Sequence, residues 1–174
     1  MEASTASGPS TKRGILAEEN SEKREEIIGL LCKAYWMEIE TVMSYIANSI
    51  NPDGVRAQEI IESLQQDIQE ELGHAQQFAQ RIKELWGVVP GSLEFSAEQS
   101  YLQPPEHQTD IVHVIKGVIE AETGAIAHYN RIIELCEGRD PVTQDMVIDI
   151  LRDEEGHRRL FEGFLREYKA EGLA

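Results

Sequence analysis

The sequence is short of cysteine, of basic residues and of long apolar runs. Its 174 residues include two cysteines, Cys32 and Cys136, which are too few for a disulfide scaffold and do not have metal-ligand spacing. No apolar run approaches the ~18 residues that a membrane span needs, so we do not expect a membrane protein. Lys and Arg total 16 against 32 Asp and Glu, a formal net charge of −16, which argues against nucleic acid as a partner.

The N-terminal segment differs in composition from the rest of the chain. Residues 1–20 are rich in Ser, Thr, Ala and Gly and have no apolar stretch of the kind found in secretory signals. We therefore expect a flexible tail over residues 1–20, a single folded domain over residues 21–174, and a cytoplasmic location. Hydrophobic residues make up 41% of the chain, enough for a packed core.

From Ser21 onward, apolar residues recur with the period of an α-helix, in four stretches of roughly 25–33 residues each. Residues 51–54 (Asn-Pro-Asp-Gly) form a turn between the first two, and Gly138, Asp140 and Pro141 give a helix end followed by a new start. Residues 87–108 contain three prolines and form a long connection. Short, long and short links predict an all-α, ferritin-like four-helix bundle with one long crossover between helices two and three.

Each apolar stripe is interrupted by a glutamate where a core residue is expected. The glutamates stand seven residues from apolar or aromatic neighbours on the same helix face. Two are also followed three residues later by a histidine, which shares that face. The six residues that should point into the bundle are Glu38, Glu71, His74, Glu122, Glu154 and His157.

The two halves of the sequence repeat this pattern. Glu38 precedes Glu71 by 33 positions, and Glu122 precedes Glu154 by 32, so each helical hairpin supplies two glutamates and one histidine. Four carboxylates together in a core require cations between them, because a lone buried carboxylate is very costly. Their charge matches two divalent ions. Carboxylate and imidazole without thiolate favour iron or manganese, and fit zinc less selectively.

Other polar residues near the stripes have simpler interpretations. Tyr45 and Tyr129 lie seven residues after a stripe glutamate and are candidates to hydrogen-bond the site. Glu40 lies off the stripes, as does Glu120, so we expect both to be solvated. His113 and His128 are interpreted as surface histidines rather than ligands, and the two cysteines as buried thiols.

These residues resemble the ferritin-like di-iron proteins, and bacterioferritin in particular. The resemblance covers roughly residues 26–168 and rests on Glu38…Tyr45, Glu71-x-x-His74, Glu122…Tyr129 and the stretch from Leu151 to His157. It implies that Glu71 and Glu154 bridge two irons while the other four residues are terminal ligands. It also implies a ferroxidase that stores iron oxide inside a hollow protein cage.

Two departures from bacterioferritin refine this expectation. Bacterioferritins have a haem-ligating methionine directly after the bridging glutamate of the second helix, and this chain has Leu72 there, so we do not expect haem. Only 17 residues follow His157, which leaves little room for the fifth helix of 24-subunit ferritins. The Dps-like (DPSL) branch, with a bacterioferritin-type site in a 12-subunit cage, is the nearest resemblance, and a 12-mer is favoured over a 24-mer.

The sequence thus predicts a ferroxidase that takes Fe(II) as substrate, uses hydrogen peroxide or dioxygen as oxidant, and stores Fe(III). Two alternatives from other classes stay open. One is a peroxide-consuming enzyme, either a rubrerythrin-like peroxidase or a manganese catalase, although the chain lacks the paired CxxC motifs of a rubredoxin electron donor. The other is a DNA-protecting binding protein that uses residues 1–20 as its contact, against which the charge of −16 argues.

Overall fold

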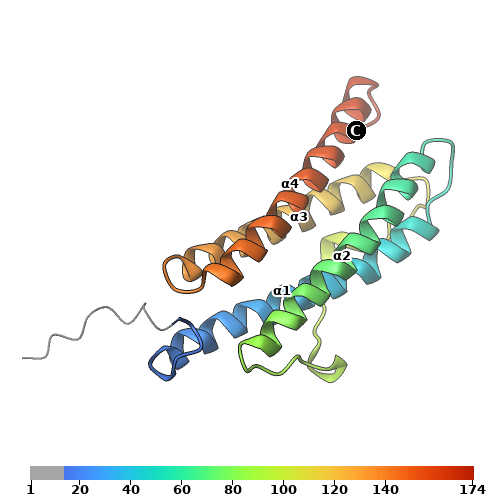
Figure 1. Ribbon diagram of the computed structural model, residues 1–174. Helices are drawn as coiled ribbons and strands as arrows, with labels where there is room; N and C mark the ends of the chain where they lie inside the picture. Colours follow the sequence, from blue (N-terminus) through green and yellow to red (C-terminus); the bar gives the residue numbers. More distant parts are fainter. Residues whose placement is uncertain (1–13) are drawn as a thin grey trace, which may run out of the picture.

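The computed structural model describes residues 14–174 and contains four long helices (Figure 1). Helix α1 spans Ser21–Ile50, α2 Gln58–Glu84, α3 Ile111–Cys136 and α4 Pro141–Ala170. The described residues contain no β-strand, and short 3₁₀ turns occur at η2 (Glu18–Asn20), η3 (Ser92–Glu94) and η4 (Ser100–Leu102). This arrangement confirms the predicted all-α, ferritin-like bundle with its long connection between α2 and α3.

The ends of α3 and α4 follow the local chemistry of the sequence. Gly138 has a φ of +67°, the left-handed conformation that glycine adopts at low cost just beyond a helix. The Asp140 carboxylate accepts a hydrogen bond from the Thr143 backbone N–H at 3.1 Å, and Pro141 occupies the first turn of α4. The predicted helix end and N-cap are therefore confirmed, and they fix the tight turn that makes α3 and α4 antiparallel neighbours.

The bundle consists of two antiparallel hairpins, α1 with α2 and α3 with α4, laid against each other (Figure 1). Helix α1 packs along α3, and α2 along α4. Buried apolar residues form two separate clusters along the bundle. One includes Leu31, Phe78 and Ile150, and the other includes Leu64 and Phe161. On each helix, the stripe glutamate lies between a residue of one cluster and a residue of the other, so a polar layer divides the core.

The crossover, residues 85–110, is held to α1 by buried polar contacts. The Glu40 carboxylate accepts hydrogen bonds from the backbone N–H of Glu98 at 2.8 Å and of Gln99 at 2.7 Å. The Asn48 amide donates to the Leu102 carbonyl at 2.8 Å. The prediction that Glu40 is solvated was wrong: it is 5% exposed, because it satisfies backbone donors of the crossover.

The predicted tail over residues 1–20 falls mostly outside the described residues, which begin at Gly14. Of its last seven residues, Ile15 is buried against the first apolar cluster. Its carbonyl accepts a hydrogen bond from the Arg24 guanidinium at 3.1 Å. Within the described part of the chain, no helix is both long enough and apolar enough to cross a membrane.

Candidate metal centre

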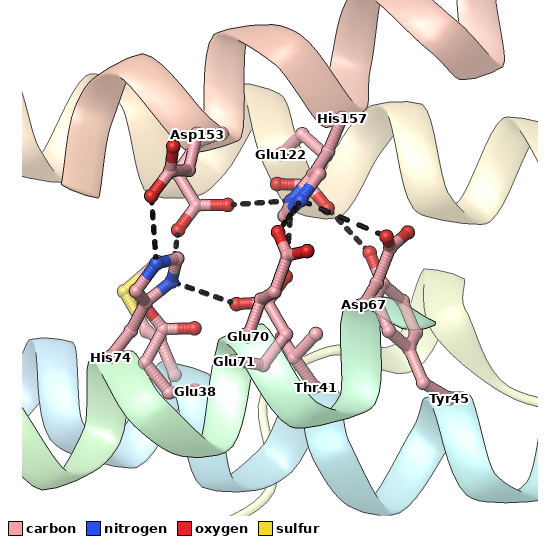
Figure 2. A network of polar contacts seen from close by, with 12 residues as sticks. Glu38, Thr41, Tyr45, Asp67, Glu70, Glu71, His74, Glu122, Asp153 and His157 are labelled. Atoms are coloured by element: carbon pink, nitrogen blue, oxygen red, sulfur yellow. Dashed lines mark hydrogen bonds and ion pairs between the residues drawn. The ribbon is translucent and has the colours of Figure 1, made fainter. Parts of the chain in front are cut away.

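All six residues that the sequence singled out lie together in the polar layer, between 1% and 8% exposed. Figure 2 labels each of them except Glu154. Their donor atoms form two groups, each with all atoms within 4.8 Å of one another. Glu71 and Glu154 belong to both groups. The first group adds Glu38 and His74, and the second adds Glu122 and His157. The geometry is therefore that of two adjoining cation positions that share two carboxylates.

The shared carboxylates each turn one oxygen toward each histidine. The Nδ1 atom of His74 lies 3.4 Å from Glu71 Oε2 and 3.1 Å from Glu154 Oε1. The Nδ1 atom of His157 lies 3.4 Å from Glu71 Oε1 and 3.4 Å from Glu154 Oε2. A pseudo-two-fold relation between the hairpins is thus visible at the level of single atoms, and it reflects the repeat in the sequence.

These central atoms are buried and lack hydrogen-bond partners. They comprise both side-chain oxygens of Glu71 and of Glu154, and the Nδ1 atoms of His74 and His157. Buried polar atoms in native proteins are almost always satisfied, because leaving one unpaired costs roughly 1–3 kcal/mol and more when charged. Six such atoms aimed at one space fit two divalent cations, whose charge would balance four carboxylates with both imidazoles neutral.

The pKa values in the metal-free protein show where protons take the place of that positive charge. Burial, with repulsion from Glu71 and Glu154, holds the pKa values of Glu38 and Glu122 well above the usual range of glutamate. Burial opposes a charged imidazole. The adjacent carboxylates of Glu154 and Glu71 outweigh it, and they raise the pKa of His74 to about 10 and that of His157 to about 12.

Two tyrosines hold the outer glutamates of the centre, each from the opposite hairpin. The Tyr45 hydroxyl on α1 donates to Glu122 Oε1 on α3 at 2.5 Å. The Tyr129 hydroxyl on α3 donates to Glu38 Oε1 on α1. Burial first, and the adjacent carboxylates second, raise the pKa of both tyrosines well above 10, so both remain donors. The expectation that they hydrogen-bond the site is confirmed.

Two further acids orient the histidines, and the sequence analysis missed them. The Nε2 atom of His74 lies 3.3 Å from Asp153 Oδ2, and that of His157 lies 3.0 Å from Glu70 Oε2 (Figure 2). An Nε2–H bond to a carboxylate fixes the ring and leaves Nδ1 free to bind a cation. The available signal was that each acid directly precedes a central glutamate, in Glu70-Glu71 and Asp153-Glu154.

Asp67, one turn before Glu71 on α2, was also missed. Its Oδ1 atom lies 3.7 Å from His157 Nε2, and its Oδ2 atom is buried without a hydrogen-bond partner. Burial raises the pKa of Asp67 to about 6, although His157 acts against that shift. With Glu70 and His157, it forms a third group of donor atoms within 4.8 Å of one another.

The remaining candidates lie away from these groups. His113 is exposed, as predicted, and its Nε2 donates to the Gln103 carbonyl. His128 is half-buried rather than on the surface, because its ring donates to the Leu30 carbonyl and so links α3 to α1. Glu120 is exposed as predicted. Of the two free thiols, Cys136 is buried and Cys32 half-buried, and neither joins a metal-binding group among the described residues.

Comparison with known proteins identifies the family. A family model described as a ferritin-like domain matches residues 28–170, which include α2, α3, α4 and most of α1. The chain belongs to the ferritin-like family. The fold and the grouping of carboxylates with histidines in its core are those that the resemblance implied, and the prediction of family is confirmed.

Two relatives place the chain within this ferritin-like family. It is 32% identical over 146 residues to the DNA protection during starvation protein of Pyrococcus furiosus, covering 81% of this chain and 77% of that protein. It is 24% identical over 148 residues to the bacterioferritin of Desulfovibrio desulfuricans, covering 84% and 78% respectively. Similarity to both kinds of protein is what the sequence led us to expect.

Two solved structures share the ferritin-like fold over most of their length. A dodecameric thioferritin, the bacterioferritin-related protein of Bacteroides fragilis, superposes with a TM-score of 0.74 at 22% identity, covering 90% of this chain and 97% of that one. The di-iron bacterioferritin of Desulfovibrio desulfuricans gives a TM-score of 0.74 at 22% identity, covering 88% and 86%. The cluster in this chain is consistent with two iron ions, as in a di-iron carboxylate protein.

Proposed function

We propose that this protein is a ferroxidase that stores and detoxifies iron in the cytoplasm. Each chain binds two Fe(II) ions as substrate, hydrogen peroxide or dioxygen accepts their electrons, and Fe(III) is stored as mineral in a homo-oligomeric cage. One observation carries the proposal. Six buried donor groups from a single chain converge in two adjoining groups, and their central atoms have no other partner.

The roles of the residues follow from this arrangement. Glu71 and Glu154 lie between the two cation positions and bind both ions, which keeps the ions close enough to give up two electrons together. Glu38 and His74 complete one position, and Glu122 completes the other with His157. Manganese or zinc would fit the same donor set, so metal preference comes from availability as well as from geometry.

The reaction balances with peroxide as the oxidant. Two Fe(II) ions supply two electrons to one hydrogen peroxide molecule, which takes up two protons and leaves as two water molecules, with two Fe(III) formed. The apolar clusters on both sides of the polar layer limit access of bulk water to the centre. Removing ferrous iron and peroxide in one step limits hydroxyl-radical formation and so protects against oxidative stress.

Substitution of the shared glutamates tests the proposal. Glu71→Ala and Glu154→Ala should each lower the initial rate of Fe(II) oxidation by more than about 100-fold, because even outer partners of metal ligands are worth 10–100-fold. The matched control is Glu120→Ala, which removes an exposed acid of α3 and should leave the rate unchanged. Unchanged oxidation rates in both shared-ligand variants would show that the centre is elsewhere.

The cage belongs to the same proposal. One similar structure is dodecameric, which supports twelve chains over twenty-four. Native mass spectrometry of the iron-free protein should give twelve chains of 19.6 kDa, about 235 kDa. A particle of about 470 kDa would indicate the larger cage, and a dimer would contradict storage.

One relative is named for DNA protection, which makes a second function worth testing. The formal charge of −16 disfavours direct DNA binding, so we expect any protection of DNA to come from removal of iron and peroxide. A gel-shift assay with duplex DNA at low salt should show no shift.

Peroxide breakdown by iron-free, manganese-loaded protein would instead favour the catalase alternative.

A further inference from the structure

The residue that follows the C-cap of α2 has a backbone conformation that is rare for a large side chain. Trp86 has a φ of +70°, and among the described residues it is the one non-glycine residue in the left-handed region. Its N–H donates to the Lys83 carbonyl at 3.1 Å, and the N–H of Gly87 donates to the Ile82 carbonyl at 2.9 Å. These two bonds form the Schellman motif, in which glycine is the usual left-handed residue.

Two other helices of this chain end with glycine at the corresponding position. Gly138 follows the C-cap of α3 with a φ of +67°, and Gly172 follows that of α4 with a φ of +73°. At α2 the same position combines backbone strain with an indole that is 75% exposed. Neither feature stabilises the single chain. Strain at a large exposed aromatic residue therefore points to a contact outside the chain.

Trp86 begins the exit segment, residues 86–93, which opens the crossover at the end of α2 (Figure 1). The exit segment contains no charged residue, although charged residues make up 28% of the chain. Val88 and Leu93 are 85% and 100% exposed, so the segment presents three large apolar side chains to solvent. Tryptophan is enriched at the centres of protein–protein interfaces, where it fills pockets of the partner.

The backbone of the exit segment is held against the bundle. Val89 is half-buried and packs against the first apolar cluster. A Cβ atom at Gly87 would lie 2.8 Å from Ile82 Cγ2 and 3.0 Å from Ile28 Cγ2, so glycine is needed for this close approach to α1 and α2. The exposed side chains are thus presented by an anchored backbone, which lowers the entropy lost when a contact forms.

We propose that the exit segment binds a second copy of this chain, with Trp86 as the anchor of the contact. The charge of the chain favours this partner. Two chains of formal charge −16 repel each other where acidic surfaces meet, and least where a surface has no charge. A cationic partner would instead be attracted to the acidic surfaces. The inference rests on the proposed function, because the proposed cage requires contacts between copies and this is one of them.

Tryptophan fluorescence tests the contact directly. The chain has two tryptophans, so Trp36→Phe leaves Trp86 as the only one. In the assembled protein, acrylamide should quench Trp86 about threefold less than it quenches N-acetyltryptophanamide, because an anchor residue is desolvated by its partner. Quenching of Trp86 close to that of the free compound would overturn the contact.

Trp86→Gly separates an interface role from a structural one. Glycine suits the left-handed position, so helix content by circular dichroism should be unchanged. The protein concentration at which half of the particles dissociate should rise about tenfold or more. Val88→Ser should raise it as well, whereas the matched control Val55→Ser, at a 99% exposed valine of the α1–α2 turn, should not. An unchanged midpoint in Trp86→Gly, or an equal rise in Val55→Ser, would overturn the proposal.

A lipid surface is the alternative occupant of an exposed apolar segment with a tryptophan. Phosphatidylcholine vesicles added to the assembled Trp36→Phe protein should leave the emission of Trp86 unchanged, because the second copy already covers the indole. A shift to shorter wavelength on addition of vesicles would assign the exit segment to a membrane and overturn the contact between copies.

The same experiments separate this inference from the proposed function. All six residues of the centre come from one chain, so dissociated Trp86→Gly chains should still bind zinc, and loss of zinc binding would contradict the proposed centre. A wild-type particle of twelve 19.6 kDa chains in which Trp86 is freely quenched overturns only the contact. A wild-type dimer in which Trp86 is protected contradicts storage and supports the contact.

Discussion

Binding of two divalent cations to the metal-free protein should release about four protons per chain near neutral pH. The number follows from the charges of the centre. Raised pKa values keep His74 and His157 as imidazolium ions, and the pKa values of Glu38 and Glu122 lie well above the normal glutamate range. A buried centre is most stable when its net charge is close to zero. Four bound protons bring the charge of this centre to zero, as two divalent cations do.

The direction of the pH dependence follows from the same exchange. Protons compete with the cations, so cation affinity should fall as pH falls from 8 toward 6. In the metal-free state, the raised pKa of His74, about 10, contributes stability that is fully present below pH 6.5 and is lost as pH rises through 10. The cation-loaded protein has no imidazolium to lose and should not show that alkaline loss.

Zinc is the cation of choice for this measurement, because it binds without redox chemistry. Isothermal titration at pH 7 in two buffers with different ionisation enthalpies gives the number of protons released. Glu120→Ala, which removes an exposed carboxylate, should match the wild-type count. Release of one proton or fewer per chain would refute the idea that protons and cations exchange at these four residues.

Two further predictions concern neighbours of the centre. Tyr129→Phe removes the hydroxyl that donates to Glu38 and should weaken zinc binding by about 10–100-fold. The control Tyr168→Phe lies outside the centre and should leave zinc affinity unchanged. Equal zinc affinities of the two variants in isothermal titration would contradict the prediction. Arg81→Met breaks a buried ion pair with Asp140 (2.8 Å) and leaves the charge of that carboxylate without its cation. The substitution should therefore lower the free energy of unfolding by about 3–5 kcal/mol. A loss below about 1 kcal/mol in denaturant unfolding would contradict this prediction.

The seven-residue spacing made most of the fold and the six central residues predictable from sequence. A glutamate that replaces a core residue on an amphipathic helix must face the interior, whatever the partner helix turns out to be. Four such interruptions, one per helix, therefore predicted a shared polar layer without any knowledge of helix packing. The same register placed Tyr45 and Tyr129 one heptad away, within reach of a glutamate on the facing hairpin.

Acids that do not interrupt the seven-residue pattern could not be found in this way when their partners lie on another element. Asp153 and Glu70 follow the pattern of solvated acids on their own helices, and only the packing of α2 against α4 brings them to the histidines. Glu40 was misassigned for a related reason. Its partners are backbone donors of the crossover, whose path over α1 is not encoded in helical periodicity. Asp67 shows the same limit, since its meaning depends on how close His157 lies.

The acidity of the chain takes on a specific meaning once these residues are placed. The formal charge of −16 counts the four carboxylates of the centre as uncompensated, and either two divalent cations or the four protons that they displace bring it to −12. Glu70 and Asp153 then form a partly exposed acidic rim beside the centre, on α2 and α4. Such a rim attracts cations toward the buried carboxylates and imidazoles of the centre. In the proposed function, negative charge thus serves this fold twice, in holding the ions and in attracting them toward the centre.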